Sequence, residues 1–311
     1  MILVFASSMQ DYDPQTDLLR DELVVQKKSF VIINPLNVED LREFSLVHEN
    51  GKLRLLRGGS ELDISTVYMS RMWRNDCVID IPQDCLYPTF FRDKIGDFLR
   101  EISAFLSGVR WFPGGYSDIQ NAESKCFLLS LAHKYGLTVP LITINSFDRP
   151  KPGSWYRKVL GYPFGITLNV QTREEVVVTL LNSKNPGKSE CNEFPWQWQT
   201  PIDPNLHIRC VVVGDKIWSS QTEETTLGGK SLREAQIDTE IIWRKHRLPT
   251  RVCSCLKDLI YALHLDMACP EFIVDTNGNY IFIDLNPCGD WFGFFEPDST
   301  AEIIEMIASN L

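Results

Sequence analysis

The feature that most constrains this chain is a strand-forming segment near its end, EFIVDTNGNYIFIDLNP, at residues 271–287. Asn277-Gly278 divides it into two runs of branched and aromatic residues, and this dipeptide suits the tight turn of a β-hairpin. If the turn takes only those two residues, Val274 pairs with Ile281. The segment therefore predicts an antiparallel hairpin with a fixed register.

The same register places two acids, Glu271 and Asp284, directly across from each other. Side chains alternate between the faces of a strand, so Asn286 shares the face of Asp284. Two carboxylates so close repel each other unless a cation lies between them, and hard oxygen ligands with phosphate as co-ligand suit Mg²⁺. Taken alone, the hairpin leaves two interpretations open: a magnesium site or the solvated polar face of an edge hairpin.

The first part of the chain alternates short apolar runs with helical periodicity. ILVF and FVIIN are expected as strands, Thr16 as a helix N-cap between them, and Asn50-Gly51 as a tight hairpin turn. A longer helix is expected over residues 88–107, with aromatic and aliphatic residues at helical spacing. TVYMSRMWR reads as a strand that ends at Arg74. This pattern predicts a small α/β N-terminal domain over residues 1–110.

Two further units are expected, at residues 111–195 and 196–311, which gives an α/β (α+β) chain. The second unit has one helix in NAESKCFLLSLAHKYG, stopped by Gly136, and strands in LITIN, WYRKVLG and VVVTLL. The third has a hairpin turned at Gly214-Asp215, a helix in VCSCLKDLIYALHL, the acidic hairpin and a closing helix from Ala301. The polar stretches 181–192 and 221–235 are expected as mobile lids that exclude water from a reaction.

Charge and cysteine content limit the partners and the compartment. The 311 residues carry a formal net charge of −10, with a pI of about 5.1, which argues against general nucleic-acid or anionic-membrane binding. No apolar run is long enough for a membrane span, and the start, MILVFASS, is expected as a strand and not as a signal peptide. Nine scattered cysteines favour reduced thiols and a cytoplasmic protein. Cys253 and Cys255 lack a matching pair at zinc-site spacing.

Several motifs, taken in order, resemble those of the ATP-grasp carboxylate ligases, and in particular the peptide maturases of the microviridin, or graspetide, type. They are NAESKCFLLSLAHKYGLTVPLITIN, WYRKVLG, QWQTP, LHIRCVVVGDKIWSSQ and FIDLNPCGDW. The resemblance covers roughly residues 115–300. It implies an ATP-grasp fold, in which an α/β N-terminal domain precedes a central subdomain and a C-terminal subdomain with the metal site.

The resemblance also implies roles for the residues that match. Glu271, Asp284 and Asn286 would hold Mg²⁺, or Mn²⁺ in its place, between the phosphates of ATP. Lys125 and Lys158 would neutralise phosphate oxygens. Phosphoryl transfer between two anions needs a metal and cations in position, and this set supplies both.

Further residues would contact the reacting groups, the adenine and the substrate. Arg209, with Lys158 and Arg244, would stabilise charge on the γ-phosphate and on an acyl phosphate. Arg74 and Gln221 would bind the substrate. The adenine edge would meet the backbone of a linker formed by Gln197, Trp198, Gln199 and Thr200. Taken singly, each lysine or arginine also has an ordinary explanation as a solvated surface charge.

The chain departs from the family's pattern at several positions. The family usually has an acid two residues before the arginine, where this chain has His207, and an acid before the Trp-Arg pair, where it has Ile242. The lengths of the two metal acids are exchanged, with Glu271 first and Asp284 second. The hinge commonly carries Glu and here does not. Because every metal position still has an oxygen ligand, catalysis is expected.

Three functional hypotheses follow. The first is an ATP-dependent ligase that phosphorylates a carboxylate of an acidic precursor peptide, so that a hydroxyl or amine attacks and forms an ester or amide. The second is a ligase that acts on free amino acids or protein termini. The third is a non-catalytic nucleotide-binding regulatory or scaffold protein, which the altered hinge and His207 would favour. A homodimer is expected from the resemblance alone.

Overall fold

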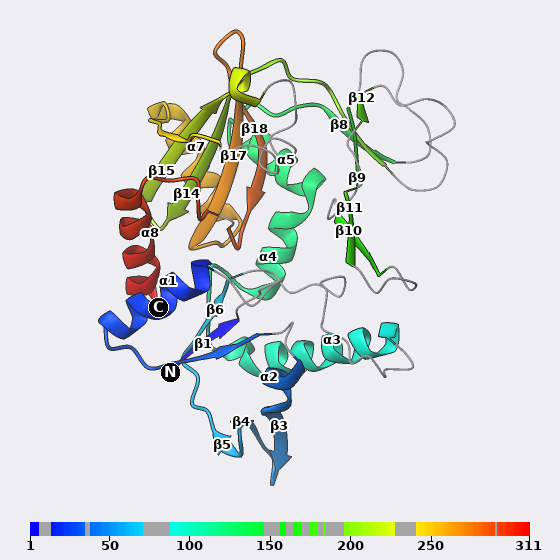
Figure 1. The fold of residues 1–311 in the computed structure, drawn as a ribbon, viewed down its shortest axis with the longest axis vertical. Helices are drawn as coiled ribbons and strands as arrows, with labels where there is room; N and C mark the ends of the chain where they lie inside the picture. Colours follow the sequence, from blue (N-terminus) through cyan, green and yellow to red (C-terminus); the bar gives the residue numbers. More distant parts are fainter. Residues whose placement is uncertain are drawn as a thin grey trace.

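The computed structural model describes residues 1–5, 14–34, 38–70, 88–145, 156–159, 164–168, 175–179, 183–184, 196–227, 241–289 and 291–311. In Figure 1 an N-terminal α/β unit lies at the bottom, a five-stranded sheet lies at the top, and the strands of a central unit lie to the right. Arg74 and most of the two expected lids fall outside the described residues.

The N-terminal unit is built on a parallel sheet of order β2-β1-β6-β7. All four side chains of β1 are buried, as expected for a strand covered on both faces. Its strands are β1 (Ile2–Phe5), β2 (Phe30–Ile33), β6 (Thr66–Met69) and β7 (Arg110–Phe112). The helical elements are α1 (Pro14–Val25), α2 (Val38–Arg42), α3 (Pro88–Phe105) and η1 (Leu106–Gly108), and a separate antiparallel meander holds β3 (Phe44–Glu49), β4 (Lys52–Arg57) and β5 (Ser60–Glu61).

Several local predictions in this unit are confirmed and one is wrong. The Asn50-Gly51 turn forms, with Glu49 opposite Lys52 and positive φ angles of 54° and 78° at the two turn residues. The first helix begins at Pro14, so Thr16 lies inside it and not at its N-cap, because proline is well suited to the first helical position. β7 pairs with β6 and straddles the expected domain boundary at residue 110.

The central unit begins with two helices where one was expected. α4 (Tyr116–Glu123) ends at Ser124, whose ψ of 101° is extended, and α5 (Lys125–Lys134) starts at the next residue. Serine favours helix ends over helix interiors, which explains the break. The strands that follow form a sheet of order β12-β9-β13-β8 and a separate hairpin. They are β8 (Ile142–Asn145), β9 (Tyr156–Val159), β10 (Phe164–Leu168), β11 (Glu175–Thr179), β12 (Ser183–Lys184) and β13 (Trp196–Gln199).

The C-terminal unit is a five-stranded sheet of order β16-β15-β14-β17-β18. Its strands are β14 (Pro204–Val213), β15 (Lys216–Glu223), β16 (Arg244–Lys245), β17 (Met267–Asp275) and β18 (Tyr280–Asn286), and its helices are η3 (Glu224–Leu227), α7 (Thr250–Ala262) and α8 (Pro297–Asn310). α8 begins four residues before the expected Ala301, with a proline in its first turn.

The two faces of this sheet are covered by different helices. One face packs against α7 and α5 and buries residues such as Ile208, Phe272 and Phe282. The other face packs against α8, which in turn contacts α1, but the buried residues there come from one end of the strands, such as Val211, Val213 and Met267. The remaining part of that second face holds the candidate site. No helix within the described ranges has the length and apolar character needed to cross a membrane.

Candidate functional site

The acidic hairpin forms, and Glu271 lies opposite Asp284 as predicted. Arg209 on β14 lies opposite Glu271 on its other side, so three charged residues stand in one row across β14, β17 and β18. Residues that face each other in an antiparallel pair share a face of the sheet. The row therefore projects from the face that α8 leaves free at this end.

The predicted register near the turn is wrong by one residue. Val274 pairs with Tyr280 and not with Ile281, because the turn is longer than two residues. Asp275 closes it by accepting hydrogen bonds from the backbone N–H groups of Asn277 at 2.9 Å and Asn279 at 2.8 Å. Hydrogen bonds from Asn279, first its side chain and then its backbone, lower the pKa of Asp275. A β-bulge at Ile283 absorbs the extra residue and restores the pairing of Glu271 with Asp284.

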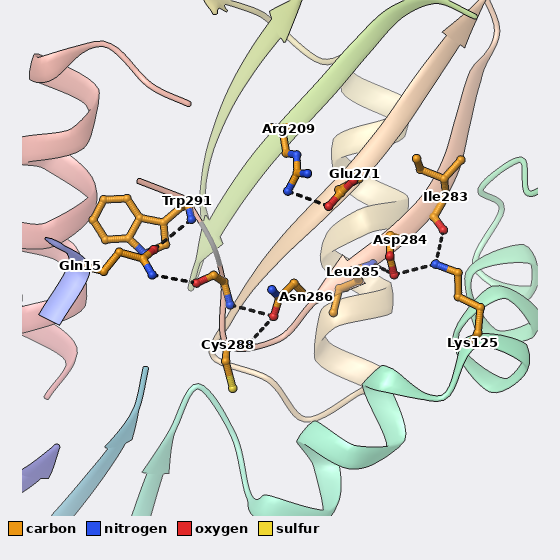
Figure 2. Close-up of polar contacts among 11 residues, drawn as sticks. Gln15, Lys125, Arg209, Glu271, Ile283, Asp284, Leu285, Asn286, Cys288 and Trp291 are labelled. Carbon is orange, nitrogen blue, oxygen red and sulfur yellow. Dashed lines mark hydrogen bonds and ion pairs between the residues drawn. The ribbon is translucent and has the colours of Figure 1, made fainter. Parts of the chain in front are cut away.

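Lys125 contacts both the bulge and the acid beside it. Its Nζ donates to the carbonyl oxygen of Ile283 at 2.6 Å and lies 2.7 Å from Oδ1 of Asp284 (Figure 2). A residue in a bulge is left unpaired in the ladder, and Lys125 supplies a partner for its carbonyl group. The lysine side chain is only 17% exposed, and these two contacts hold its ammonium group beside β18.

Arg209 forms the second ion pair of the row. Its Nη1 lies 2.7 Å from Oε1 of Glu271, and the side chains are 15% and 21% exposed. The ring of Phe294 lies 4.7 Å from the guanidinium carbon. Figure 2 shows this pair and the Lys125–Asp284 pair at neighbouring positions of the same sheet. Each carboxylate of the site thus has its own cation.

Two buried polar atoms beside this pair have no hydrogen-bond partner among the described residues. They are Nε of Arg209 and Oγ of Ser220, which faces Arg209 across the β14–β15 pair. Buried polar groups in native proteins are nearly always paired with protein, water or a ligand. Their position on the site face makes them donors for an anionic ligand.

Asn286 follows on the same strand, but its side chain is used locally. Its Oδ1 accepts hydrogen bonds from the backbone N–H groups of Cys288 and Gly289, both at 3.1 Å. Gly289 has a φ of +62°, and a Cβ atom there would lie 2.5 Å from Sγ of Cys269, so the turn requires glycine. An amide oxygen has two lone pairs, and both are engaged in this turn. The metal role of Asn286 stays a prediction, and it would require the side chain to leave these contacts.

The predicted adenine linker forms strand β13 and continues into Thr200. Gln197 lies directly opposite Lys158 of β9, and the backbone N–H of Thr200 donates to the carbonyl of Leu141 at 3.0 Å. The structure thus brings the backbone of Lys158 beside the linker, while the Lys158 side chain lies outside the described side chains. Buried side-chain atoms of Gln197, Trp198 and Gln199 lack partners within the described ranges.

Gln221 does not join the charged row. It pairs with Ile208, so it lies on the face of the sheet that packs against α7, opposite to the face of Arg209. There its Oε1 lies 2.5 Å from Nδ1 of His246, whose Nε2 lies 3.0 Å from the hydroxyl of Tyr280. Burial lowers the pKa of His246. The residue of β15 that lies opposite Arg209 on the site face is Ser220, and counting outward from the Gly214-Asp215 turn identifies it.

Arg244 is exposed on the edge strand β16, where it pairs with Gln221 and not with Ser220, and it lines a cavity of about 310 Å³ at this edge of the sheet. Trp218, Ser220, Trp243 and Phe294 also line it, and the rings of Trp243 and Phe294 meet edge to face at 5.2 Å. Phe294 links this cavity to Arg209. Sequence patterns had not identified Phe294, because it follows the strand in an irregular segment. Among the described residues no cluster of three or more His, Cys, Asp and Glu could hold a metal, so an ion here would rely on the carboxylate pair and on ligand oxygens.

The whole chain is similar in fold to solved structures of ATP-grasp enzymes. The macrocyclase MdnC from Microcystis aeruginosa MRC, bound with precursor peptide MdnA, matches with a TM-score of 0.76 and 18% identity over 100% of this chain and 99% of that chain. A RiPP-associated ATP-grasp ligase from Chryseobacterium gregarium, in complex with ADP and a leader and core peptide, matches with a TM-score of 0.77 and 19% identity over 100% of this chain and 96% of that chain. D-alanine–D-alanine ligase from Bacillus anthracis, complexed with ATP, matches with a TM-score of 0.53 and 12% identity over 98% of this chain and 93% of that chain.

No protein-family model matches this chain, and no curated protein matches it. At sequence identities below 20%, a similar structure shows the fold alone. The mixture of helices and sheets described above agrees with it, and the expected fold is confirmed. The chain therefore has the ATP-grasp fold.

Proposed function

We propose that this chain is an ATP- and Mg²⁺-dependent ligase that activates a carboxylate as an acyl phosphate. The observation that carries the proposal is that Glu271 and Asp284, side by side on one face of the sheet, are paired with Arg209 and with Lys125. Phosphoryl transfer from a nucleotide to a carboxylate brings several negative charges together. It needs fixed cations and metal-binding oxygens side by side, as here.

The residues present fit a magnesium ion. Glu271 and Asp284 would hold it, with Asn286 as a third oxygen ligand once its side chain leaves the local turn. Mg²⁺ takes hard oxygen ligands and usually keeps waters and substrate phosphates in its shell, so two carboxylates are sufficient protein ligands. When bound, the ion neutralises phosphate charge and orients the transferred group; Mn²⁺ has the same ligand preference.

The remaining residues of the site have complementary roles in this proposal. Arg209 and the Ser220 hydroxyl would donate hydrogen bonds to developing negative charge on the phosphoryl and acyl oxygens, while Lys125 and Lys158 would hold nucleotide phosphates. The linker from Gln197 to Thr200 would meet the adenine. Attack of a hydroxyl or amine on the acyl carbon would release phosphate and leave an ester or amide.

An acidic precursor peptide is the substrate that we propose. The cavity near Arg209 is lined by aromatic rings and by three cations, Lys216, Arg244 and Lys245, which outnumber its two acids, Glu296 and Glu302, and this balance suits an acidic side chain on a peptide. Two of the structures with a similar fold are described with a precursor peptide or with a leader and core peptide. The D-alanine–D-alanine ligase likeness supports the second candidate, a ligase of free amino acids or protein termini. The non-catalytic alternative is weakened by the two intact carboxylate–cation pairs.

The nucleotide site is tested by calorimetric titration of a non-hydrolysable ATP analogue with Mg²⁺. The wild type is expected to bind, and Asp284→Asn combined with Asn286→Ala is expected to reduce affinity at least tenfold, because a metal ligand and a Lys125 partner are lost. Asp258→Asn, which removes an exposed carboxylate on α7, is the matched control and should bind like wild type. Equal binding by all three proteins, or no binding by any, would contradict the proposal.

The substrate class is tested by release of ADP. We would compare synthetic acidic peptides, including those encoded beside the gene, with free amino acids at equal carboxylate concentration. ADP release with a peptide, and a product lighter by one water, supports the precursor-peptide proposal. Turnover with free amino acids alone supports the second candidate, and nucleotide binding without any ADP release supports the third.

A further inference from the structure

His207 and Glu224 form a hydrogen-bonded pair next to the charged row. Nε2 of His207 lies 2.6 Å from Oε2 of Glu224, and the side chains are 14% and 31% exposed. His207 lies two residues before Arg209 on β14, so both side chains project from the site face, about 7 Å apart along the strand. The chain thus has an imidazole on the face where an activated carboxylate would lie.

Glu224 is held in place by the short helix η3. This helix follows β15 directly and contacts β14. Thr226 fixes its first turn by donating to the carbonyl of Glu223 at 2.6 Å, and its hydroxyl lies 3.1 Å from that of Thr222. The carboxylate of Glu224 therefore has a defined position behind the imidazole.

The second ring nitrogen of His207 is available. Nδ1 has no hydrogen-bond partner among the described residues, whereas Glu224, an acceptor, fixes a proton on Nε2. In the neutral tautomer that this acceptor favours, the lone pair is on Nδ1. A histidine whose one nitrogen is oriented by a carboxylate and whose other nitrogen is free is the arrangement of a general base.

We propose that His207 is the general base for the nucleophile in the second half of the reaction, with Glu224 as its positioning residue. This rests on the ligase function proposed above. The hydroxyl oxygen or amine nitrogen attacks the acyl carbon, the bond from that carbon to the phosphate oxygen breaks, and phosphate leaves. The nucleophile's proton moves to Nδ1 of His207 and then to solvent, and Glu224 stabilises the imidazolium formed in between.

The pair also accounts for a departure in the sequence. The resemblance places an acid two residues before the arginine, and this chain has histidine there. Glu224 brings a carboxylate to the same place from a different element, so the site keeps an acid and gains a proton acceptor. A purely structural ion pair would fasten η3 to β14 but would have no effect on how an activated carboxylate is partitioned between nucleophiles.

The test separates activation from acyl transfer by adding hydroxylamine, a small nucleophile that needs no enzymatic base. The assay contains ATP, Mg²⁺ and the peptide that releases most ADP. His207→Gln and Glu224→Gln should each raise the ratio of hydroxamate to coupled product by about 100-fold, the scale of general-base catalysis, because only coupling needs the base. The double variant should be no worse than either single variant, since the two residues act as a unit. Glu223→Gln, which removes the neighbouring exposed acid, is the matched control and should leave the ratio unchanged.

The outcomes are distinguishable. If the wild type is active and His207→Gln loses hydroxamate and coupled product equally, His207 is not the general base, and the proposed ligase function still stands. No ADP from the wild type with any probe would overturn the ligase function, and the base with it. A readout independent of turnover is the tautomer of His207 by ¹⁵N NMR, identified by the signal missing in His207→Gln: Nε2–H with bare Nδ1 supports the pair, and Nδ1–H overturns it.

Discussion

Lys125 occupies an unusual place for a lysine, the first position of a helix, where its charge opposes the positive end of the helix dipole. Asp284 offsets this at 2.7 Å, and the bulge carbonyl of Ile283 adds a hydrogen bond at 2.6 Å. The lysine therefore depends on β18, and β18 in turn depends on the lysine to pair a carbonyl that its ladder leaves open.

We predict that Lys125→Met lowers the free energy of unfolding by about 1–3 kcal/mol, the cost of leaving a partly buried carbonyl unpaired. It should also weaken binding of the ATP analogue about tenfold or more, because a phosphate-neutralising charge is lost. Urea unfolding and calorimetry measure the two effects. Lys134→Met, at the exposed far end of the same helix, is the control. Unfolding free energies that agree between the two variants would show that the bulge contact is unimportant.

The motif that contains Lys125 leads to its proposed role near the phosphates, but it does not predict the contacts that Lys125 makes. The partner carbonyl exists only because of a bulge at Ile283, and the bulge exists only because the turn is one residue longer than its Asn-Gly dipeptide suggests. Ser220 is different: counting outward from Gly214-Asp215 places it opposite Arg209 from sequence alone.

At the scale of elements, one hydrogen-bonded network holds the edge strand β16 to the sheet. His246 follows β16 directly, and its ring links Gln221 of β15 to Tyr280 of β18. Its backbone N–H also donates to the carbonyl of Ser219 at 2.8 Å, and the Ser219 hydroxyl donates to the carbonyl of His246. Trp243 and Arg244, which line the cavity, are thereby held in place by the contacts of His246.

We predict that the protein loses stability as the pH falls below the ordinary histidine pKa of about 6.5. Burial lowers the pKa of His246 in the folded chain, so the unfolded chain binds the proton more readily. Acid therefore shifts the equilibrium toward the unfolded chain. Urea unfolding at pH 7.5, 6.5 and 5.5 should show a smaller acid loss in His246→Gln than in wild type. His48→Gln, on an exposed strand, should keep the wild-type dependence; identical slopes in all three proteins would contradict the assignment.

The elements of the acidic hairpin show what periodicity and turn residues can predict. The pairing of Glu271 with Asp284 is confirmed although two local features were missed, because the longer turn closed by Asp275 and the bulge at Ile283 cancel. The split of α4 from α5 was missed as well, since the apolar periodicity continues through Ser124 and the break depends on backbone conformation there. The pair of His207 with Glu224 depends on how η3 folds back, which no local pattern encodes.

At the scale of the whole molecule, the N-terminal unit holds the segment that follows β18. Gln15 of α1, only 3% exposed, donates from Nε2 to the carbonyl of Gly289 at 3.3 Å and accepts from the backbone N–H of Trp291 at 3.0 Å (Figure 2). One side chain thus pairs two backbone groups of the segment that follows Asn286. Residues nearly a whole chain length apart meet here, which only the assembled fold can bring about.

We predict that Gln15→Ala lowers the free energy of unfolding by about 2 kcal/mol, since buried backbone groups are left without partners. Gln26→Ala, which removes a half-exposed glutamine between α1 and α8, is the control and should cost less. Urea unfolding measures both. If the two variants lose the same stability, the contact of Gln15 with the segment after β18 contributes no more than a surface contact. The order of motifs was sufficient to predict the fold, but this contact between units was not.

The paired charges of the site have a consequence for turnover. The charges of Lys125, Asp284, Arg209 and Glu271 sum to zero, so each charge of these two pairs already has a counter-ion. In the proposed reaction, a nucleotide that enters would exchange partners with these residues, and the original pairs would re-form when the product leaves. Entry and exit would then differ little in free energy, which favours repeated cycles over tight retention of product.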